Sequence, residues 1–412
     1  MPTRASSALR YAWFVVVLLF PVALLNYLDR QMLATMKGSM VADIPTIANQ
    51  ADWGLVLGCF KWTYALLSPL GGYVADRFSK RHVIAASLFV WSAVTWWTGH
   101  VTSFHELVAA RATMGISEAF YIPTALALIS EYHQGFTRSR AVGLHQAGIY
   151  VGQILGGFAG YAADSSDYGW RWAFSTSGML GVIYALPLFA LLRNPVPTTP
   201  VPEVRAETTG GVFRGLLGNR NFLLLVLYFT LPAIAGWVVR DWMPEILREK
   251  FHLGQGKAGV SAILFVQIAS LVGVLVGGTL ADRWMRTNSR GRIFTSAIGM
   301  TLFLPALFGI GNAGTLPLAI AGLVVFGLGW GFFDCNNMPI LCQIVRPAWR
   351  ATGYGIMNLV SISFGGFGDW SFGALRDRQV PLNLIFGVFA GVALLSVFIA
   401  LLIRPSEERS LA

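Results

Sequence analysis

Two short stretches decide the fold: GGYVADRFSKR at residues 71–81 and GGTLADRWMRT at residues 277–287. Each stretch begins with a glycine pair at the end of an apolar run and continues into an Asp-Arg pair. Asp76 and Asp282 lie 206 positions apart, which is half of the 412-residue chain. Two copies at this offset predict an internal duplication, with two parallel repeats of the same helical arrangement.

The composition places the chain in a membrane. Hydrophobic residues make up 55% and charged residues 12% of the chain, whereas soluble domains carry about 25% charged residues. The net charge of +10 does not indicate a nucleic-acid partner, because the basic residues fall in short loops between apolar runs. Cys59, Cys335 and Cys342 lie in apolar stretches and are expected to be buried thiols, with neither a disulfide nor a metal site.

Apolar runs long enough to cross a bilayer, at about 20 residues each, occur twelve times. They cover residues 11–36, 52–75, 82–100, 105–131, 139–163, 170–192, 222–246, 258–281, 292–312, 316–341, 350–374 and 380–403. The polar stretch RNPVPTTPVPEVRAETTGG follows the sixth run and is predicted to be a linker, neither helix nor strand. We therefore expect an N-terminal six-helix bundle at 1–193, a cytoplasmic linker at 194–221 and a C-terminal six-helix bundle at 222–412.

The positive charges orient these helices. With a cytoplasmic N-terminus, nineteen of the 30 Lys and Arg residues fall in cytoplasmic loops, seven in outer loops and four within spans. Because cytoplasmic loops carry the excess of Lys and Arg, both termini are predicted to be cytoplasmic. The expected fold is an all-α, multi-pass protein of the inner or plasma membrane, with twelve transmembrane helices in two six-helix pseudo-repeats.

The stretch at 71–81 resembles the cytoplasmic loop signature of the major facilitator superfamily, with Ser79 where a second glycine is usual. The resemblance implies the major facilitator fold, alternating access and a binding site between the two halves near the midplane. It also implies that this loop and its repeat act in gating, where a glycine permits close helix approach. The predicted gating residues are Gly72, Asp76, Arg77, Gly278, Asp282 and Arg283.

Four charges lie within two predicted spans. Asp29 and Arg30 stand side by side in the first, and the fourth contains Arg111 and Glu118. Seven residues of helix are nearly two turns, so Arg111 and Glu118 point the same way, about 10 Å apart. A charge at the centre of a transmembrane helix costs about 2.5–3.5 kcal/mol. Because spans one and four face each other in the superfamily, we expect the four charges to meet in one water-filled site. A purely structural ion pair is the alternative.

Such a cluster suits the coupling of a proton to an anion. An arginine keeps its charge and offers a planar fork to a carboxylate. A partly desolvated carboxylate takes up a proton more readily, above all when a substrate anion displaces its arginine partner. Glu118 is the predicted main proton carrier, because its helix neighbours are small and apolar, and Asp29 is the second.

NYLDR together with R-x6-E-A resembles the anion:cation symporters, a branch that includes sugar-acid and organic-anion carriers and relatives of sialin and the vesicular glutamate transporters. In that branch these charges bind the anion and couple it to protons. The resemblance implies proton-coupled symport of a small organic anion, with a sugar acid such as an aldonate or hexuronate expected. The predicted substrate contacts are Tyr27, Arg30, Lys61, Tyr64, Arg111, Gln146, Asn336, Asn337 and Asn358.

Several of these positions carry open alternatives. Lys61 stands where the branch usually has a small polar residue, and it could face the cavity, pair with Asp29 or reach outward. The polar stretch FFDCNNMPILCQ contains Asp334 beside the two asparagines and is expected to bind substrate hydroxyls, with a coupling-ion site as the alternative. Arg240 and Asp241 are expected to form a gate pair with each other, with substrate contact as the alternative.

Two other transport functions stay open. Spinster-type lipid or lysolipid carriers also resemble this chain, with an Asp-Arg in span one and an Arg and Glu-Ala in span four. The polar stretch around Asp334 argues against the apolar cavity that a lipid needs. In a neutral-sugar or muropeptide carrier, the arginines would act only in proton coupling and would not bind the substrate. No nucleophile elbow, zinc spacing or phosphate loop indicates an enzyme. We expect a monomer that contacts lipid, an anionic substrate and protons, without a cofactor other than the coupling proton.

Overall fold

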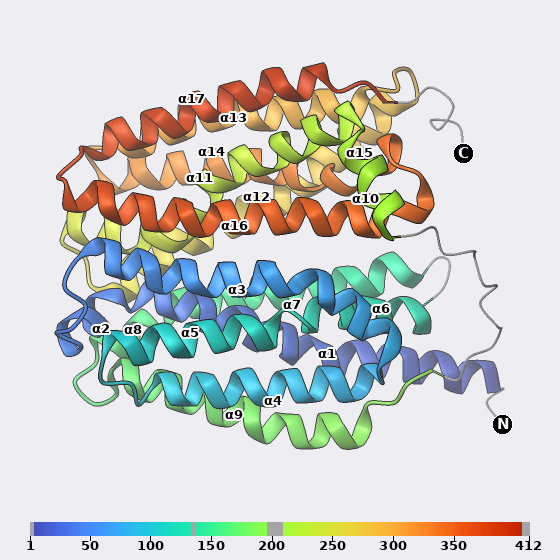
Figure 1. Cartoon of the computed structure of the whole chain (residues 1–412). Helices are drawn as coiled ribbons and strands as arrows, with labels where there is room; N and C mark the ends of the chain where they lie inside the picture. The colour runs from blue at the N-terminus through green and yellow to red at the C-terminus, as the bar shows by residue number, and fades with distance from the viewer. Residues whose placement is uncertain (1–3, 134–136, 196–208, 406–412) are drawn as a thin grey trace. The chain divides into compact units, whose positions relative to one another are not determined.

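The computed structural model of the chain describes residues 4–133, 137–195 and 209–405, and the secondary structure in these ranges is helical (Figure 1). The chain divides into two compact units. Unit 1 is Met1–Pro200 together with Asp241–Val260, and unit 2 is Val201–Arg240 together with Ser261–Ala412. Two helices, α11 and α12, therefore contribute residues to both units.

Unit 1 is built from α1 to α9 and from the junction of α11 and α12. Within it α1 packs along α7, α3 along α5, and α4 along α9 (Figure 1). The helices are α1 Arg4–Thr35, α2 Lys37–Asp43, α3 Gln50–Arg77, α4 Lys80–Thr98, α5 Phe104–Glu118, α6 Tyr121–Tyr132, α7 Arg138–Phe158, α8 Gly160–Asp164 and α9 Gly169–Leu191.

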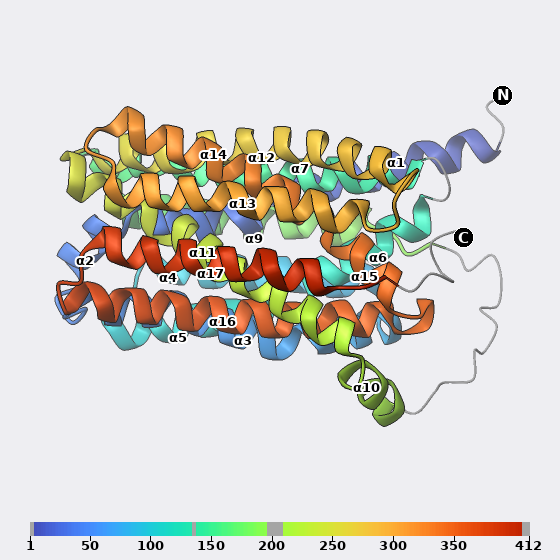
Figure 2. The same cartoon turned by 90° about the horizontal axis from the view of Figure 1, so that it is seen from above.

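Unit 2 contains the remaining helices. Helix α13 packs against both α14 and α17, which lie beside it in the two views (Figure 2). The helices are α10 Thr209–Leu217, α11 Arg220–Phe251, α12 Gln255–Met285, α13 Gly291–Asn312, α14 Leu316–Asp334, α15 Asn337–Ile344, the 3-10 turn Pro347–Trp349, α16 Arg350–Asp377 and α17 Leu382–Leu402.

Each of the twelve predicted spans lies almost wholly within a helix or a pair of consecutive helices, which confirms the all-α architecture for the described residues. Eight of these segments are long and apolar enough to cross a membrane by length and composition. The other four, in α3, α4, α7 and α16, carry more polar or charged residues, and their crossing stays a prediction, as does the cytoplasmic position of the termini. Large apolar side chains such as Leu66 and Leu186 are 70% and 67% exposed, which suits a surface in contact with lipid.

Two predicted spans are each broken into two helices. The fourth span consists of α5, which ends at Glu118, and α6, which begins at Tyr121. The tenth span breaks in the same way between α14 and α15. Pro123 and Pro339 are each the third residue of the second helix, and a proline supplies no N–H for the carbonyl four residues earlier. The two breaks occupy equivalent places in the two halves, as the internal duplication predicts.

The predicted linker at 194–221 lies partly outside the described residues, which leave out 196–208. The polar stretch that defines it was expected to contain no helix, yet its last three residues open α10. Leu216 of α10 is buried in the apolar core of unit 2 with Phe222 and Met357. Because apolar burial stabilises a short helix more than its intrinsic propensity does, composition alone did not indicate α10.

Candidate functional site

An ion pair between α1 and α5 forms the centre of the candidate site in unit 1. Nε of Arg30 donates to Oε2 of Glu118 at 2.7 Å. The Glu118 side chain is fully buried and that of Arg30 is 14% exposed. The second carboxylate oxygen of Glu118, Oε1, has no hydrogen-bond partner among the described residues. Spans one and four are therefore in contact through an ion pair, as expected, and Oε1 of Glu118 remains able to accept a further hydrogen bond.

Three aromatic rings surround the Arg30 guanidinium. Its central carbon lies 4.7 Å from the centres of the Tyr27 and Phe60 rings and 5.1 Å from that of Tyr64. Such cation–π contacts stabilise a desolvated guanidinium and hold its plane in place. The structure thus brings the predicted contacts Tyr27 and Tyr64 to Arg30. The sequence analysis did not single out Phe60, although it lies one helical turn before Tyr64.

Arg111 is a buried cation with a different environment. It is 3% exposed, and its guanidinium carbon lies 4.4 Å from the centre of the Phe60 ring. Nη1 points to the sulfur of Met114 at 2.8 Å, and Nε has no hydrogen-bond partner in the part of the chain that the structure describes. A thioether is a weak acceptor, and no carboxylate of the described residues forms an ion pair with Arg111. This guanidinium can therefore accept an anion without giving up a protein carboxylate.

Asp29 forms no ion pair among the described residues and contacts α4 instead. Its Oδ2 is 2.8 Å from the Thr95 hydroxyl of α4, and its Oδ1 has no hydrogen-bond partner within the described ranges. The same hydroxyl lies 2.9 Å from the carbonyl oxygen of Trp91. Because a hydroxyl has one proton, Thr95 donates fully to only one of the two acceptors. A proton on Asp29 would satisfy both contacts. Thr95 offered no signal in the sequence, since it lies among Trp residues in an apolar run.

Close helix approach at Gly115 sets the position of α5 against α3. A Cβ atom at this glycine would lie 2.5 Å from the carbonyl oxygen of Phe60 and 3.1 Å from the backbone N of Tyr64. Only a residue without a side chain lets the two backbones come this near. The contact lies one helical turn from Arg111 and from Glu118, so it determines how far both side chains reach toward α1.

Replacing Gly115 by alanine should therefore destabilise unit 1. Inserting a methyl group against backbone atoms costs about 1–3 kcal/mol, because neither backbone can move aside cheaply. The expected result is a lower unfolding temperature of the purified protein in detergent. Gly143 is the control, because a Cβ there meets nothing within 4 Å. Equal unfolding temperatures for Gly115→Ala and Gly143→Ala would contradict the assignment.

Lys61 has a partner that the sequence analysis did not consider. Its ammonium pairs with the carboxylate of Asp241, and both side chains are largely buried, at 4% and 12% exposure. Asp241 thus pairs with α3, and no ion pair of the described residues joins it to its neighbour Arg240, contrary to the expected gate pair. Arg240 lies instead over the ring of Trp237, at 5.1 Å. The substrate role of Lys61 stays a prediction. Gln146 is exposed on α7, and no contact places it with the Arg30 cluster.

The predicted contacts of unit 2 lie at and beyond the break between α14 and α15. Asn336 occupies the break itself, is buried, and donates to the carbonyl oxygen of Phe332 at 3.0 Å. Asn337 is the first residue of α15 and is also buried, and Asn358 is half-buried on α16. Asp334 is exposed at the end of α14. Their assignment to substrate hydroxyls stays a prediction.

The predicted gating residues lie at the ends of α3 and α12. Arg77, Asp282 and Arg283 are exposed in the structure. For Gly72 and Asp76 only the backbone, which belongs to α3, lies within the described part. Gly71 and Gly277 are sites of close approach: a Cβ at Gly71 would lie 2.6 Å from the carbonyl oxygen of Ala119, and one at Gly277 would lie 2.9 Å from Cα of Phe332. At Gly278 the same atom would meet open space.

Comparison with known proteins gives matches along nearly the whole chain. Protein spinster of Drosophila melanogaster is 27% identical over 393 residues, which make up 92% of this chain and 64% of that protein. The chain thus spans less than two thirds of the length of this relative. Human protein spinster homolog 1 is 27% identical, with coverage of 90% and 74%. The D-galactonate transporter of Escherichia coli O6:H1 is 26% identical, with coverage of 95% and 87%.

Solved structures share the fold. A bacterial homolog of the human lysosomal transporter Spinster superposes with a TM-score of 0.77 at 20% identity, over 95% of each chain. A D-xylose–proton symporter gives a TM-score of 0.76 at 18% identity, over 97% of this chain and 99% of that one. The sequence profile of the Major Facilitator Superfamily matches residues 19–368. The chain therefore belongs to the Major Facilitator Superfamily and is a multi-pass membrane transporter, not an enzyme.

Proposed function

We propose that this transporter carries a small organic anion together with protons, and that the anion is a sugar acid such as an aldonate or a hexuronate. One observation carries the proposal: Arg111 is a buried guanidinium that has no carboxylate partner among the described residues, next to a carboxylate–guanidinium pair that can exchange partners. A buried charge without a partner is costly. A substrate carboxylate at Arg111 would remove that cost, which favours an anionic substrate over a neutral one.

The coupling step follows from competition for Arg30. When a substrate carboxylate approaches the two arginines, Arg30 can turn part of its planar fork from Glu118 to the anion. Glu118, fully buried, then loses its counter-charge and takes up a proton, because a buried carboxylate is more stable when neutral. The proton and the anion thus enter together. Asp29 is the proposed second proton carrier, and its contact with Thr95 is best satisfied when it holds a proton.

The D-galactonate transporter supports the choice of substrate class. That protein is named for a sugar acid, and its match covers 95% of this chain. A sugar acid combines one carboxylate with several hydroxyls, so it needs a cationic group and additional hydrogen-bond partners. The guanidinium of Arg111 and the hydroxyls of Tyr27 and Tyr64 supply groups of both kinds within unit 1.

Uptake into proteoliposomes with an imposed inside-alkaline pH gradient tests the proposal. The panel consists of D-galactonate, D-gluconate and D-galacturonate, with D-galactose as the neutral counterpart. We expect at least one acid to accumulate above its external concentration, D-galactose to remain at equilibrium, and a proton ionophore to abolish the accumulation. Uptake of an acid that is unaffected by the ionophore would contradict proton coupling.

The spinster relatives favour a second candidate, transport of a lysolipid. They match the chain at 27% identity, and a spinster homolog shares its fold. Transfer of a lysophospholipid between leaflets, with no uptake of any sugar acid, would support this function. Accumulation of D-galactose alone would instead support a neutral-sugar carrier, in which the arginines serve only the protons.

A further inference from the structure

The short helix α10 carries apolar side chains on two of its faces. Leu216 is 1% exposed in the apolar core of unit 2, and Val212, four residues earlier, packs against the same core. Phe213 and Leu217 form a second pair four residues apart, and they are 42% and 53% exposed. Residues at this spacing lie on one side of a helix. The side of α10 that contains Phe213 and Leu217 is therefore an apolar surface that unit 2 does not cover.

Packing against Trp349 holds α10 at the end of unit 2. A Cβ at Gly215 would lie 2.5 Å from Cζ3 of the Trp349 ring, so a larger residue there would keep the helix away from the ring. Both views place α10 where α11 and α16 begin, and Figure 2 shows it projecting to the side of these two helices (Figures 1 and 2). Helix α11 is long and apolar enough to cross a membrane. An amphipathic helix beside its end suits the boundary between lipid head groups and acyl chains.

Two exposed arginines lie in the chain beside this apolar surface. Arg214 follows Phe213 directly on α10, and Arg220 begins α11, three residues after Leu217. An arginine can lay its aliphatic stem along apolar surface while its guanidinium stays in water or at a lipid head group. The apolar pair and the two charges therefore belong to one short stretch of the chain.

Two further exposed arginines lie near α10 although they belong to other parts of the chain. The guanidinium carbon of Arg346 lies 5.1 Å from the centre of the Trp349 ring, against which α10 packs. The backbone N–H of Arg404 donates at 3.1 Å to Oδ1 of Asn221, the residue that follows Arg220. The six side chains together are called the α10 patch, and they are Phe213, Arg214, Leu217, Arg220, Arg346 and Arg404.

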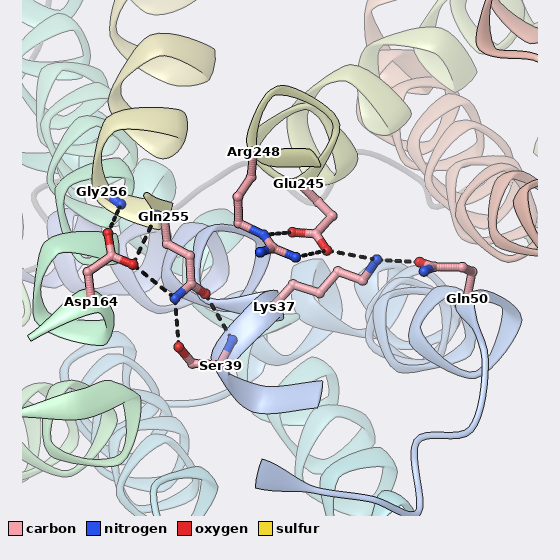
Figure 3. Close-up of polar contacts among 8 residues, drawn as sticks. All are labelled: Lys37, Ser39, Gln50, Asp164, Glu245, Arg248, Gln255 and Gly256. Atoms are coloured by element: carbon pink, nitrogen blue, oxygen red, sulfur yellow. Dashed lines mark hydrogen bonds and ion pairs between the residues drawn. The ribbon is translucent and has the colours of Figure 1, made fainter. Parts of the chain in front are cut away.

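The arginines of the α10 patch differ from two other arginines at the protein surface. Arg248 donates to both oxygens of Glu245, at 2.7 and 3.0 Å (Figure 3). Arg171 donates to the carboxylate of Asp43 at 2.7 Å. The four arginines of the patch form no ion pair with any carboxylate that the structure describes. The patch thus combines unpaired cations with exposed apolar side chains, which fits a ligand with an anionic head and an apolar body.

We propose that the α10 patch binds an anionic phospholipid of the cytoplasmic leaflet, with its phosphate at the arginines and its acyl chains along Phe213 and Leu217. The planar fork of a guanidinium matches the oxygens of a phosphate. The predicted topology puts α10 on the cytoplasmic side, where the leaflet carries negative lipids. The lipid is bound and not transported, and the patch shares no residue with the Arg30 cluster. The inference rests on α10 and not on the proposed sugar acid, so each can fail without the other.

The composition of the patch favours a lipid over two other occupants. A free phosphate would satisfy the arginines but would leave Phe213 and Leu217 exposed. A second copy of the chain, joined through the same patch by a two-fold axis, would bring the four arginines of one copy against those of the other. An anionic phospholipid satisfies both kinds of side chain, because it joins a negative phosphate to apolar chains.

Native mass spectrometry of the purified full chain tests the proposal. Phosphatidylglycerol is compared with phosphatidylcholine of the same acyl chains, since only the first has a net negative charge. We expect phosphatidylglycerol to bind more tightly than phosphatidylcholine, and Arg214→Gln combined with Arg220→Gln to weaken its binding roughly 25-fold. One arginine near an anionic membrane surface contributes about a factor of five. Binding of phosphatidylcholine should be unchanged in this double variant.

Changes to the apolar side chains should have a different effect. Phe213→Ser combined with Leu217→Ser removes contacts with acyl chains, which both lipids share, so it should weaken the binding of both. Inorganic phosphate at the same concentration as the lipid should not displace phosphatidylglycerol, because it has no acyl chains.

Arg378→Gln is the matched control, because Arg378 is also exposed but follows α16 at the far end of that helix from Arg350. It should bind phosphatidylglycerol as the unaltered chain does. Arg404→Gln changes a different part of the chain, so it keeps the test valid if the double arginine variant misfolds. It should weaken binding about fivefold.

Four results would overturn the proposal. The first is normal phosphatidylglycerol binding by the arginine variants, and the second is an equal loss of binding in Arg378→Gln. The third is displacement of the lipid by inorganic phosphate, which would make the patch a simple anion site. The fourth is a dimer that the double arginine variant abolishes, which would assign the patch to a second copy of the chain.

Discussion

Replacing Glu118 by glutamine should abolish proton-driven accumulation of the substrate while leaving exchange of substrate across the membrane intact. Glutamine has nearly the same shape as glutamate but carries no titratable proton. The variant cannot load the proton whose uptake is linked to anion binding at Arg30, and Asp29, which forms no ion pair with Arg30 in the described part of the chain, cannot replace that link. Exchange of labelled for unlabelled substrate requires binding but no net proton movement, so it should persist. The loss of accumulation should be complete within the sensitivity of the assay.

Glu106→Gln is the control for this prediction, because Glu106 lies on the same helix and accepts from the backbone N of Thr102 at 2.7 Å, near the start of α5. It should accumulate substrate as the unaltered protein does. Retained exchange also shows that Glu118→Gln folds, although it leaves Arg30 without a counter-charge. Normal accumulation by Glu118→Gln would remove Glu118 from the coupling mechanism and leave Asp29 as the candidate carrier.

Replacing Arg111 by glutamine should raise the half-saturating concentration of an anionic substrate by roughly 30-fold or more. Removing one partner of a buried charge pair costs about 2–5 kcal/mol, and each 1.4 kcal/mol is about a factor of ten. Arg111→Lys should recover part of the loss, because it keeps the charge but not the planar fork that holds a carboxylate by two hydrogen bonds. Initial uptake rates across a range of concentrations separate the half-saturating concentration from the maximal rate.

Arg193 offers a matched control, because its guanidinium also lies over an aromatic ring, that of Tyr11, at 5.8 Å. Tyr11 is 19 residues before Arg30 on α1, so this contact is far from the candidate site. Arg193→Gln should leave both kinetic parameters unchanged. If Arg111→Gln lowers only the maximal rate, Arg111 acts in the conformational step and does not bind the anion. If its effect is the same for D-galactose as for the acids, the guanidinium does not recognise a carboxylate.

The fold was predictable to a large extent, because its signals are local or repeated. The spans follow from apolar composition, and the duplication follows from two copies of one stretch at half the chain length. What the sequence analysis missed are the interruptions within spans four and ten. Pro123 and Pro339 were visible in the sequence, but a proline in a membrane helix can be tolerated with a kink, so their presence alone does not show that a helix ends.

The charges of the candidate site were also visible, since Asp, Glu and Arg are rare and costly within a membrane span. Their partners were not. Sequence reasoning offered Asp29, Arg30, Arg111 and Glu118 as one group, and Lys61 with three possible environments. In the structure Lys61 pairs with Asp241, and Asp29 contacts Thr95 in place of an arginine. Phe60, Met114 and Thr95 look in the sequence like any other residues of a buried helix.

The sequence by itself determined that the chain is a membrane protein built of two related helical halves, with ionisable groups in spans one and four. Composition, spacing and repetition along the chain suffice for these conclusions. Only the tertiary structure decided that Glu118 pairs with Arg30. The same holds for the contacts of Arg111 with Met114 and the Phe60 ring, and for the place of the α11–α12 junction in unit 1. These outcomes depend on how each helix is rotated about its axis and on how closely neighbouring helices approach. Contacts between residues far apart in the chain determine both the rotation and the distance.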